Sequence, residues 1–270
     1  MVAGIVCCDT NIALCAKDST EMRGSMNNIT IKVENLTFSY GTTPVLQGIS
    51  FSANGKESVG IIGENGAGKS TLLKLLVGLY LDFAGSITVN GLPVTKKNLP
   101  EIRQKIAYVF QDADHQLFMT TAYEDVAFAP RNYGLPEDEV EKRTLQALEQ
   151  VGALSLRDKQ VCRMSGGEKK LVSIATILSM FPDIIVMDEP SAALDPRNRR
   201  NLIHLMNGFD KLKLITSHDL DFILDTCDRV ILLDHGRVIA DDAAEKILQN
   251  QILLEEHGLE LPLSLYRRGE

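Results

Sequence analysis

The sequence predicts an α/β fold built around a mostly parallel β-sheet, and three observations support this expectation. Short strand-like segments, such as the apolar 184–187 and the segment 213–216, alternate with longer helix-like segments along the second half of the chain. Strands that are apolar at every position are typical of parallel sheets, because helices cover both of their faces. A glycine-rich loop at 63–70 joins one such strand to a helix-like segment, and 44% of the 270 residues are apolar, which is ample for a large core.

The first half of the chain is predicted to contain five short strands and one helix. Ile29, Ile31 and Val33 alternate with polar residues, which indicates a strand with one buried face. The turn-forming pair Asn54-Gly55 separates the next two apolar segments. The further elements predicted here are strands at 46–51, 58–62, 86–90 and 106–110, and a helix with a leucine stripe at 69–79.

The second half of the chain is predicted to be richer in helices. Pro136 and acidic residues open an amphipathic helix at 137–151, and a more apolar helix follows at 171–180. After these, the periodicity predicts strands at 184–187, 213–216 and 230–233, separated by helices at 197–207 and 220–225, with a last helical stretch at 240–249.

Charge and hydropathy argue against several classes of protein. The formal charge is −8 and the isoelectric point is about 5.2, whereas a general nucleic-acid-binding protein is expected to be basic, so we expect no nucleic-acid partner. The longest apolar run, 171–181, is interrupted by hydroxyl residues and is shorter than the roughly 18 residues of a membrane helix. The five cysteines form no Cys-x-x-Cys pair, which argues against a structural zinc site and favours a reducing compartment.

The first 25 residues differ from the rest of the chain. They lack the basic start of a signal peptide, and Met26 stands directly before the first strand-like segment. We therefore expect residues 1–25 to be a leader or a non-native start that is disordered and lies outside the fold.

Residues 63–70 read Gly-Glu-Asn-Gly-Ala-Gly-Lys-Ser and fit the phosphate-loop pattern G-x-x-x-x-G-K-[ST] at every fixed position. In such a loop the backbone N–H groups and the helix N-terminus bind the phosphates. Lys69 would contact the β- and γ-phosphates, and Ser70 would place its hydroxyl on Mg²⁺. The residues expected to bind the nucleotide here are Gly63, Glu64, Asn65, Gly66, Ala67, Gly68, Lys69, Ser70 and Thr71.

Two carboxylates, Asp188 and Glu189, end the apolar segment at 184–187. A lone Asp-Glu pair is usually a solvated loop, but a buried strand before it and a phosphate loop upstream favour a functional interpretation. Asp188 is expected to bind Mg²⁺ directly or through water, and Glu189 to polarise the attacking water as a general base.

Ser165, Gly166 and Gly167 precede a helix and offer exposed N–H groups together with a hydroxyl. Alone, this pattern favours an ordinary helix cap. With the phosphate loop and the Asp188-Glu189 pair in this order, however, the sequence resembles an ATP-binding cassette (ABC) ATPase. The signature of that family usually begins with Leu and ends with Gln; Met164 and Glu168 replace these residues and leave the Ser-Gly-Gly core intact.

The resemblance implies roles for further residues. Gln111 matches the glutamine-loop residue that contacts Mg²⁺ or the attacking water and reports to the membrane partner. Asp195 ends the segment 191–195, which matches the loop that crosses the dimer interface, and His218 matches the switch histidine at the γ-phosphate. Tyr40 matches the aromatic residue that stacks on adenine. The alternatives are a capping or buried histidine at 218 and an ordinary strand-end surface aromatic at 40.

The resemblance also implies the architecture: a P-loop NTPase of ABC ATPase type, with a RecA-like core of mostly parallel sheet, additional antiparallel strands and a helical subdomain. The ATP-binding domain would span 26–245, with the helical subdomain at about 112–180 and a short tail at 246–270. In this family two chains enclose two ATP molecules, and the Ser165 signature faces the nucleotide of the other subunit. The chain is therefore expected to dimerise with itself or with a related ATPase.

The region after Gln111 indicates the kind of cassette. Residues 114–118 (Asp-His-Gln-Leu-Phe) and 124–130 resemble the energy-coupling-factor ATPases of vitamin and transition-metal uptake, although His115 stands where an acidic residue is usual. The nearby apolar side chains either form a groove for a partner helix or pack the core of the helical subdomain; they are Leu117, Phe118, Met119 and Tyr123. The chain length resembles that of the dedicated cobalt, nickel or biotin members, which homodimerise.

The sequence thus predicts the ATP-hydrolysing subunit of an energy-coupling-factor uptake transporter for cobalt, nickel or a vitamin, with ATP and Mg²⁺ as cofactors. The resemblance implies a transmembrane scaffold and a substrate-capture subunit as partners, and a peripheral position on the cytoplasmic face of the cell membrane. The alternative is the ATPase of an ordinary ABC importer or exporter. ABC ATPases of DNA repair or translation need a long coiled-coil insertion or a second cassette, for which the chain has no room.

Overall fold

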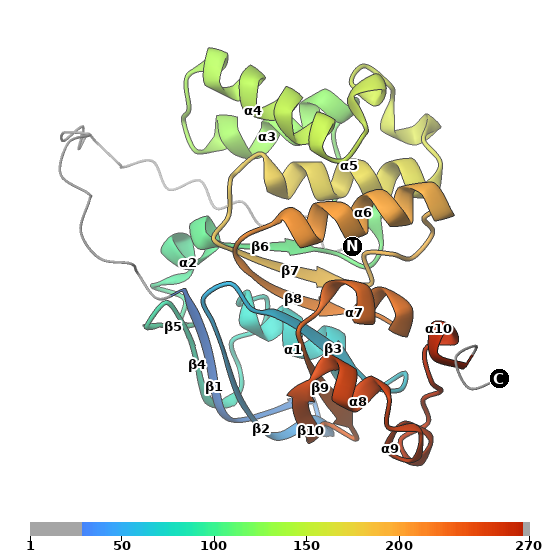
Figure 1. Ribbon diagram of the computed structural model, residues 1–270. Coiled ribbons are helices and arrows are strands. Elements are labelled where there is room, and N and C mark those ends of the chain that lie inside the picture. The colour runs from blue at the N-terminus through green and yellow to red at the C-terminus, as the bar shows by residue number, and fades with distance from the viewer. Residues whose placement is uncertain (1–28, 267–270) are drawn as a thin grey trace.

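The computed structural model describes residues 29–266, so the predicted leader at 1–25 lies outside the described residues (Figure 1). The described chain forms a six-stranded sheet, a four-stranded sheet and a layer of helices above them in the view of Figure 1. The predicted α/β class, with a mostly parallel sheet, additional antiparallel strands and a helical part, is confirmed.

The six-stranded sheet has the order β10-β9-β3-β8-β7-β6. All neighbouring pairs are parallel except β10 and β9, which are antiparallel. Every residue of β3, β7 and β8 is buried, which explains why most of their residues are apolar. The strands are β3 (Ser58–Ile62), β6 (Ile106–Val109), β7 (Ile184–Asp188), β8 (Leu212–Thr216), β9 (Arg229–Asp234) and β10 (Arg237–Ala243).

The four-stranded sheet is antiparallel, with the order β2-β1-β4-β5. Its first strand buries Ile31, Val33, Leu36 and Phe38, and a bulge between Val33 and Leu36 breaks the alternation after the residues on which the prediction rests. The strands are β1 (Thr30–Tyr40), β2 (Thr43–Asn54), β4 (Ala84–Val89) and β5 (Leu92–Pro93).

Three helices pack against one another and form the helical layer: α3 (Ala122–Asn132), α4 (Glu137–Gln150) and α5 (Gly166–Leu178). They lie inside the range of about 112–180 expected for the helical subdomain. The remaining α-helices are α1 (Lys69–Leu76), α2 (Leu99–Lys105), α6 (Pro196–Gly208), α7 (Leu220–Thr226), α8 (Ala244–Leu248), α9 (Gln251–Glu256) and α10 (Leu263–Tyr266). Short 3₁₀ turns occupy Ala113–His115, Leu154–Leu156 and Val161–Arg163.

The helix predicted at 240–249 is wrong in its first part. Residues Arg237–Ala243 form β10, which pairs antiparallel with β9, and only Ala244–Leu248 are helical. None of the β10 residues is fully buried, so the strand is defined by its hydrogen bonds to β9 and leaves little hydrophobic pattern in the sequence. The predicted tail at 246–270 packs in part against the rest of the protein, since Leu254 is fully buried in the core.

The turn between β9 and β10 is tied to the phosphate loop. Gly236 donates its N–H to the carbonyl oxygen of Ala67 (3.2 Å) and accepts from the N–H of Gln47 (2.8 Å). Its φ is +74°, and a Cβ atom at this position would lie 2.1 Å from the carbonyl oxygen of Val45. Glycine is therefore required by both the backbone conformation and the close approach of β2.

We expect Gly236→Ala to lower the free energy of unfolding by more than the roughly 1–2 kcal/mol that a left-handed conformation costs an ordinary residue, because the added methyl group also clashes with β2. Urea denaturation followed by circular dichroism measures this loss. Gly134→Ala is the matched control, since Gly134 has a φ of +75° and open space around it. Equal losses in the two variants would contradict the clash.

Candidate functional site

A cavity of about 310 Å³ lies where the carboxyl ends of β3, β7 and β8 meet. It is formed by segments that are far apart in the sequence, and it brings most of the predicted site residues together. Its lining consists of Tyr40, Val45, Asn65, Gly66, Gly68, Lys69, Ser70, Thr71, Gln111, Glu189 and His218.

The phosphate loop is closed around the side chain of its own lysine. Gly68, the residue before α1, has a φ of +103°, and a Cβ there would lie 2.6 Å from Leu46 Cδ2. Lys69 is buried, and its Nζ donates to the carbonyl oxygens of Gly63 (2.7 Å) and Glu64 (2.9 Å). Burial lowers the pKa of Lys69, against the opposing effect of the nearby acidic residues. The loop and the start of α1 therefore present N–H groups and a cation to an anion.

Asp188, at the end of β7, is surrounded by hydroxyl groups. Its Oδ1 accepts from Ser70 Oγ (2.9 Å) and from Thr216 Oγ1 (2.7 Å), and its Oδ2 accepts from the Tyr108 hydroxyl (3.2 Å). Asp188 is only 2% exposed, and burial raises the pKa of Tyr108. A carboxylate beside the hydroxyl of Ser70 is an oxygen-only donor set, which is the kind that Mg²⁺ prefers.

Glu189 is held in a strained conformation next to the cavity. Its φ is +50°, and its backbone N–H donates to the Thr216 carbonyl oxygen (3.1 Å). One carboxylate oxygen, Oε2, accepts from the N–H of His218 (3.1 Å). The other, Oε1, is buried and has no hydrogen-bond partner within residues 29–266. An unpartnered carboxylate oxygen at the wall of a cavity can accept a proton from a bound water molecule.

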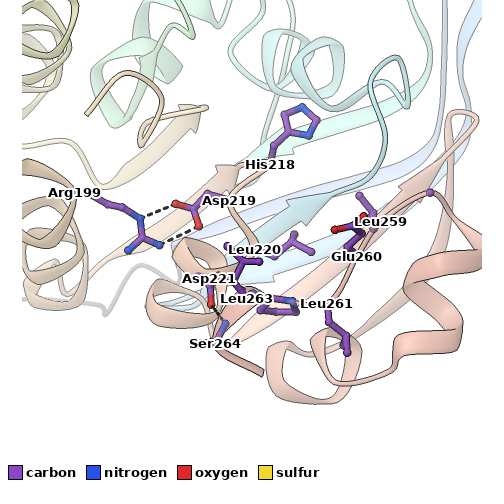
Figure 2. A pocket seen from close by; sticks show the side chains of 12 residues that line it. Arg199, His218, Asp219, Leu220, Asp221, Leu259, Glu260, Leu261, Leu263 and Ser264 are labelled. Atoms are coloured by element: carbon purple, nitrogen blue, oxygen red, sulfur yellow. Dashed lines mark hydrogen bonds and ion pairs between the residues drawn. The ribbon is translucent and has the colours of Figure 1, made fainter. Parts of the chain in front are cut away.

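His218 lies at the junction of two cavities. Its side chain is 45% exposed, and Nε2 is 3.5 Å from Glu189 Oε1. It lines the cavity of the phosphate loop and a larger one of about 820 Å³ between α7 and the C-terminal segment, where Arg199 is paired with Asp219 (Figure 2). Asp219, and not His218, caps α7. The alternative of a capping or buried histidine at 218 is therefore wrong.

Tyr40 and Gln111 lie on the wall of the smaller cavity. Tyr40 is 43% exposed and packs edge-on against Phe38 and Tyr80, with ring centroids 4.9 and 5.5 Å away. The carbonyl oxygen of Gln111 accepts from Lys170 Nζ on α5 (2.6 Å), which ties this loop to the helical layer. An exposed aromatic ring at the cavity offers a stacking surface for a planar base.

The signature residues do not line this cavity. Ser165 caps α5 and forms a capping box with Glu168, which also pairs with Lys159 (2.7 Å); this pairing accounts for a glutamate in place of the usual glutamine. Gly166 and Gly167 open the same helix, and Asp195 caps α6. That Ser165, Gly166, Gly167 and Asp195 serve a nucleotide bound to a second subunit stays a prediction.

Sequence analysis missed three residues that support the site. Lys170 is buried, and its Nζ holds the carbonyl oxygens of Phe110 and Gln111; the pKa of Lys170 is lowered by burial. A lysine inside an apolar helix is a signal that could have revealed it. Thr216 and Tyr108 lie in strands next to β7, where the sequence gives no sign of their bonds to Asp188.

Comparison with known proteins identifies the family. Residues 46–192 match the family model described as ABC transporter. A protein of Geobacter sulfurreducens named for an ABC transporter ATP-binding function is 48% identical over 241 residues, covering 89% of this chain and 97% of that protein. The chain belongs to the ABC transporter family. It is an ATPase of that family and the ATP-binding subunit of a transporter.

Other ABC proteins are similar over most of the chain. The energy-coupling factor transporter ATP-binding protein EcfA of Carboxydothermus hydrogenoformans is 42% identical over 240 residues, covering 87% of this chain and 88% of that protein. The structure of cbiO1 from Clostridium perfringens, part of the ABC transporter complex cbiONQ, has a TM-score of 0.75 at 34% identity and covers 90% of this chain and 100% of that one. The ATP-binding cassette MJ0796, in a dimeric post-hydrolysis state bound to ADP and Pi, has a TM-score of 0.73 at 26% identity, over 79% of this chain and 98% of that one.

Among residues 29–266 of this ABC ATPase, no helix combines the length and apolar character needed to cross a bilayer.

We expect Glu189→Gln to retain ATP binding and to lose hydrolysis by about 10²–10⁴-fold, because an amide cannot accept the proton of the attacking water. Phosphate release and ATP binding measure the two properties separately. Glu101→Gln, an exposed substitution on α2, is the control and should hydrolyse ATP like the wild type. Hydrolysis at the wild-type rate by Glu189→Gln would show that Glu189 is not the base.

Proposed function

We propose that this ABC ATPase is the energy-coupling-factor type of subunit, which binds and hydrolyses ATP to drive the uptake of a transition metal, cobalt or nickel, or of a vitamin. The similarity to EcfA and to cbiO1 supports this subtype, as does the sequence at 114–118. The partners would be a transmembrane scaffold and a substrate-capture subunit, with this chain peripheral to the cytoplasmic face of the membrane.

The cavity supports the half of a hydrolytic site that one chain would supply. The phosphate loop and Lys69 would bind the phosphates of ATP, and the ring of Tyr40 would stack on adenine. Ser70, Gln111 and Asp188 would hold Mg²⁺, which supplies charge neutralisation on the phosphates when bound. The observation that carries the hydrolytic role is Oε1 of Glu189, which has no hydrogen-bond partner within the described chain and lies at the cavity wall, 3.5 Å from His218 Nε2. His218, whose N–H holds the other oxygen, would contact the γ-phosphate.

The second half of each site would come from a second copy of the chain or a related ATPase. Ser165 and Asp195 lie outside the cavity of their own chain, so a single chain does not enclose the nucleotide. The dimeric state of the similar cassette MJ0796 supports this arrangement. The signature would then complete the partner's site.

A groove beside the helical layer, separate from the two cavities described above, supports the docking of a membrane subunit. It has a volume of about 290 Å³, lies between β6, α3 and α5, and includes Phe118, Phe128 and Tyr133 in its wall. Phe118 is 65% exposed and packs edge-on against Phe128, with ring centroids 4.8 Å apart. Leu117 is buried in the core, whereas Phe118 lies on the surface, so the predicted apolar cluster supplies residues both to the core and to the groove.

A buried acidic residue, Asp125, also lines this groove. It is only 4% exposed; its Oδ1 accepts from the N–H groups of Phe118 (3.0 Å) and Met119 (3.1 Å), whereas Oδ2 has no partner within the described chain. Burial raises the pKa of Asp125. Apolar walls and an exposed aromatic ring suit a partner helix with apolar side chains.

We expect Phe118→Ser to reduce co-purification with the membrane subunits by tenfold or more, because a central aromatic anchor typically contributes about 2 kcal/mol or more to an interface. Basal ATP hydrolysis should persist, because Phe118 does not line the nucleotide cavity. Ile252→Ser is the matched control, since Ile252 is 71% exposed on α9 and lies outside this groove. Equal recovery of partners by both variants would remove the groove from the interface.

The subtype itself is tested by affinity purification of the chain from its own detergent-solubilised membranes. We expect a small transmembrane scaffold and a substrate-capture subunit, and the capture subunit would define the class of solute. A pair of large permeases would instead assign the chain to an ordinary ABC importer or exporter. Recovery without any membrane protein would contradict both assignments.

A further inference from the structure

Among residues 29–266, the Tyr108 hydroxyl is the hydrogen-bond donor to Asp188 that comes from β6. Tyr108 is half-buried and pairs with Val186 of β7 in parallel register. Side chains two residues apart lie on the same face of a strand, so Val186 and Asp188 share the face that Tyr108 flanks. The phenol thus extends along β7 and places its oxygen 3.2 Å from Asp188 Oδ2.

The two oxygens of Asp188 are held from opposite sides. Oδ1 accepts from Ser70 and Thr216, whereas Oδ2 accepts from Tyr108. A carboxylate rotates about its terminal bond in a broad energy well, so contacts at one oxygen leave its plane loosely defined. The Tyr108 hydroxyl, as a donor to Oδ2, fixes the plane of the carboxylate. The carboxylate lone pairs that accept no hydrogen bond then point in a defined direction.

We propose that Tyr108 is a positioning residue for the metal site: its hydroxyl orients the Asp188 carboxylate that receives Mg²⁺. Groups that orient a metal ligand typically change metal affinity by about 10- to 100-fold when they are removed. The inference rests on the proposed role of Asp188 in binding Mg²⁺.

Tyr108 also has a packing role, and the two roles can be separated. Its ring meets Phe110 edge-on, with centroids 4.7 Å apart, and forms part of the wall of the groove that contains Phe118. A phenylalanine at 108 keeps the ring and these contacts and removes only the hydroxyl. A purely structural tyrosine would therefore tolerate this change without an effect on metal binding.

The test is the binding of Mn²⁺, which reports on the Mg²⁺ site, to the full chain in the presence of ADP, followed by electron paramagnetic resonance. We expect Tyr108→Phe to bind Mn²⁺ about tenfold more weakly than the wild type. Its affinity for ADP in a chelator should be unchanged. Tyr133→Phe is the matched control and should behave like the wild type, because Tyr133 lines the same groove and its hydroxyl bonds no protein group within residues 29–266.

Asp188→Asn separates this inference from the proposed function. Loss of Mn²⁺ binding in Asp188→Asn together with wild-type binding in Tyr108→Phe would overturn the inference and leave the role of Asp188 intact. Wild-type Mn²⁺ binding in Asp188→Asn would overturn both. A Tyr108→Phe variant that loses metal-free ADP affinity in the same proportion as Mn²⁺ affinity would also overturn the inference, because the hydroxyl would then support the loop as a whole.

Discussion

The site depends on one buried carboxylate, that of Asp188, which accepts hydrogen bonds from three hydroxyl groups on three different elements. Ser70 comes from the helix after the phosphate loop, Thr216 from β8 and Tyr108 from β6. Burying a carboxylate is costly unless its oxygens are hydrogen-bonded. These bonds satisfy that requirement and also fix the relative positions of the elements that surround the cavity.

The backbone is strained at the residue that follows Asp188. Glu189 adopts a φ of +50°, and its N–H donates to the Thr216 carbonyl oxygen. Its Oε1 has no hydrogen-bond partner within the described chain and lies 3.5 Å from His218 Nε2 at the cavity wall. A strained backbone conformation persists only where the surrounding structure holds it in place, and here the hydrogen bond from Glu189 to Thr216 of β8 does so. The carboxylate expected to bind metal and the one expected to accept a proton are therefore positioned by a single strand end.

The sequence could predict the parts of the fold that leave a local pattern. The buried strand at 58–62 and the phosphate loop are recognisable because the strand is rich in β-branched apolar residues and the loop has fixed glycines. Strand β10 was missed because no residue in it is fully buried, and α3 was missed although its capping box, Thr121 with Glu124, is visible in the sequence. The bond between Tyr108 and Asp188 joins residues 80 positions apart, so only the register of β6 on β7 reveals it.

The packing of the signature explains how two distant motifs can act together. A methyl group at Gly167 would lie 3.1 Å from the carbonyl oxygen of Ala193, which itself has a φ of +64°. The start of α5 and the loop at 191–195 are thus in close contact, and a larger residue than glycine would push them apart. Lys170, on the same helix, binds the carbonyl oxygen of Gln111. The start of α5 therefore brings the signature and the loop before α6 into contact, and the same helix is bonded to the glutamine loop.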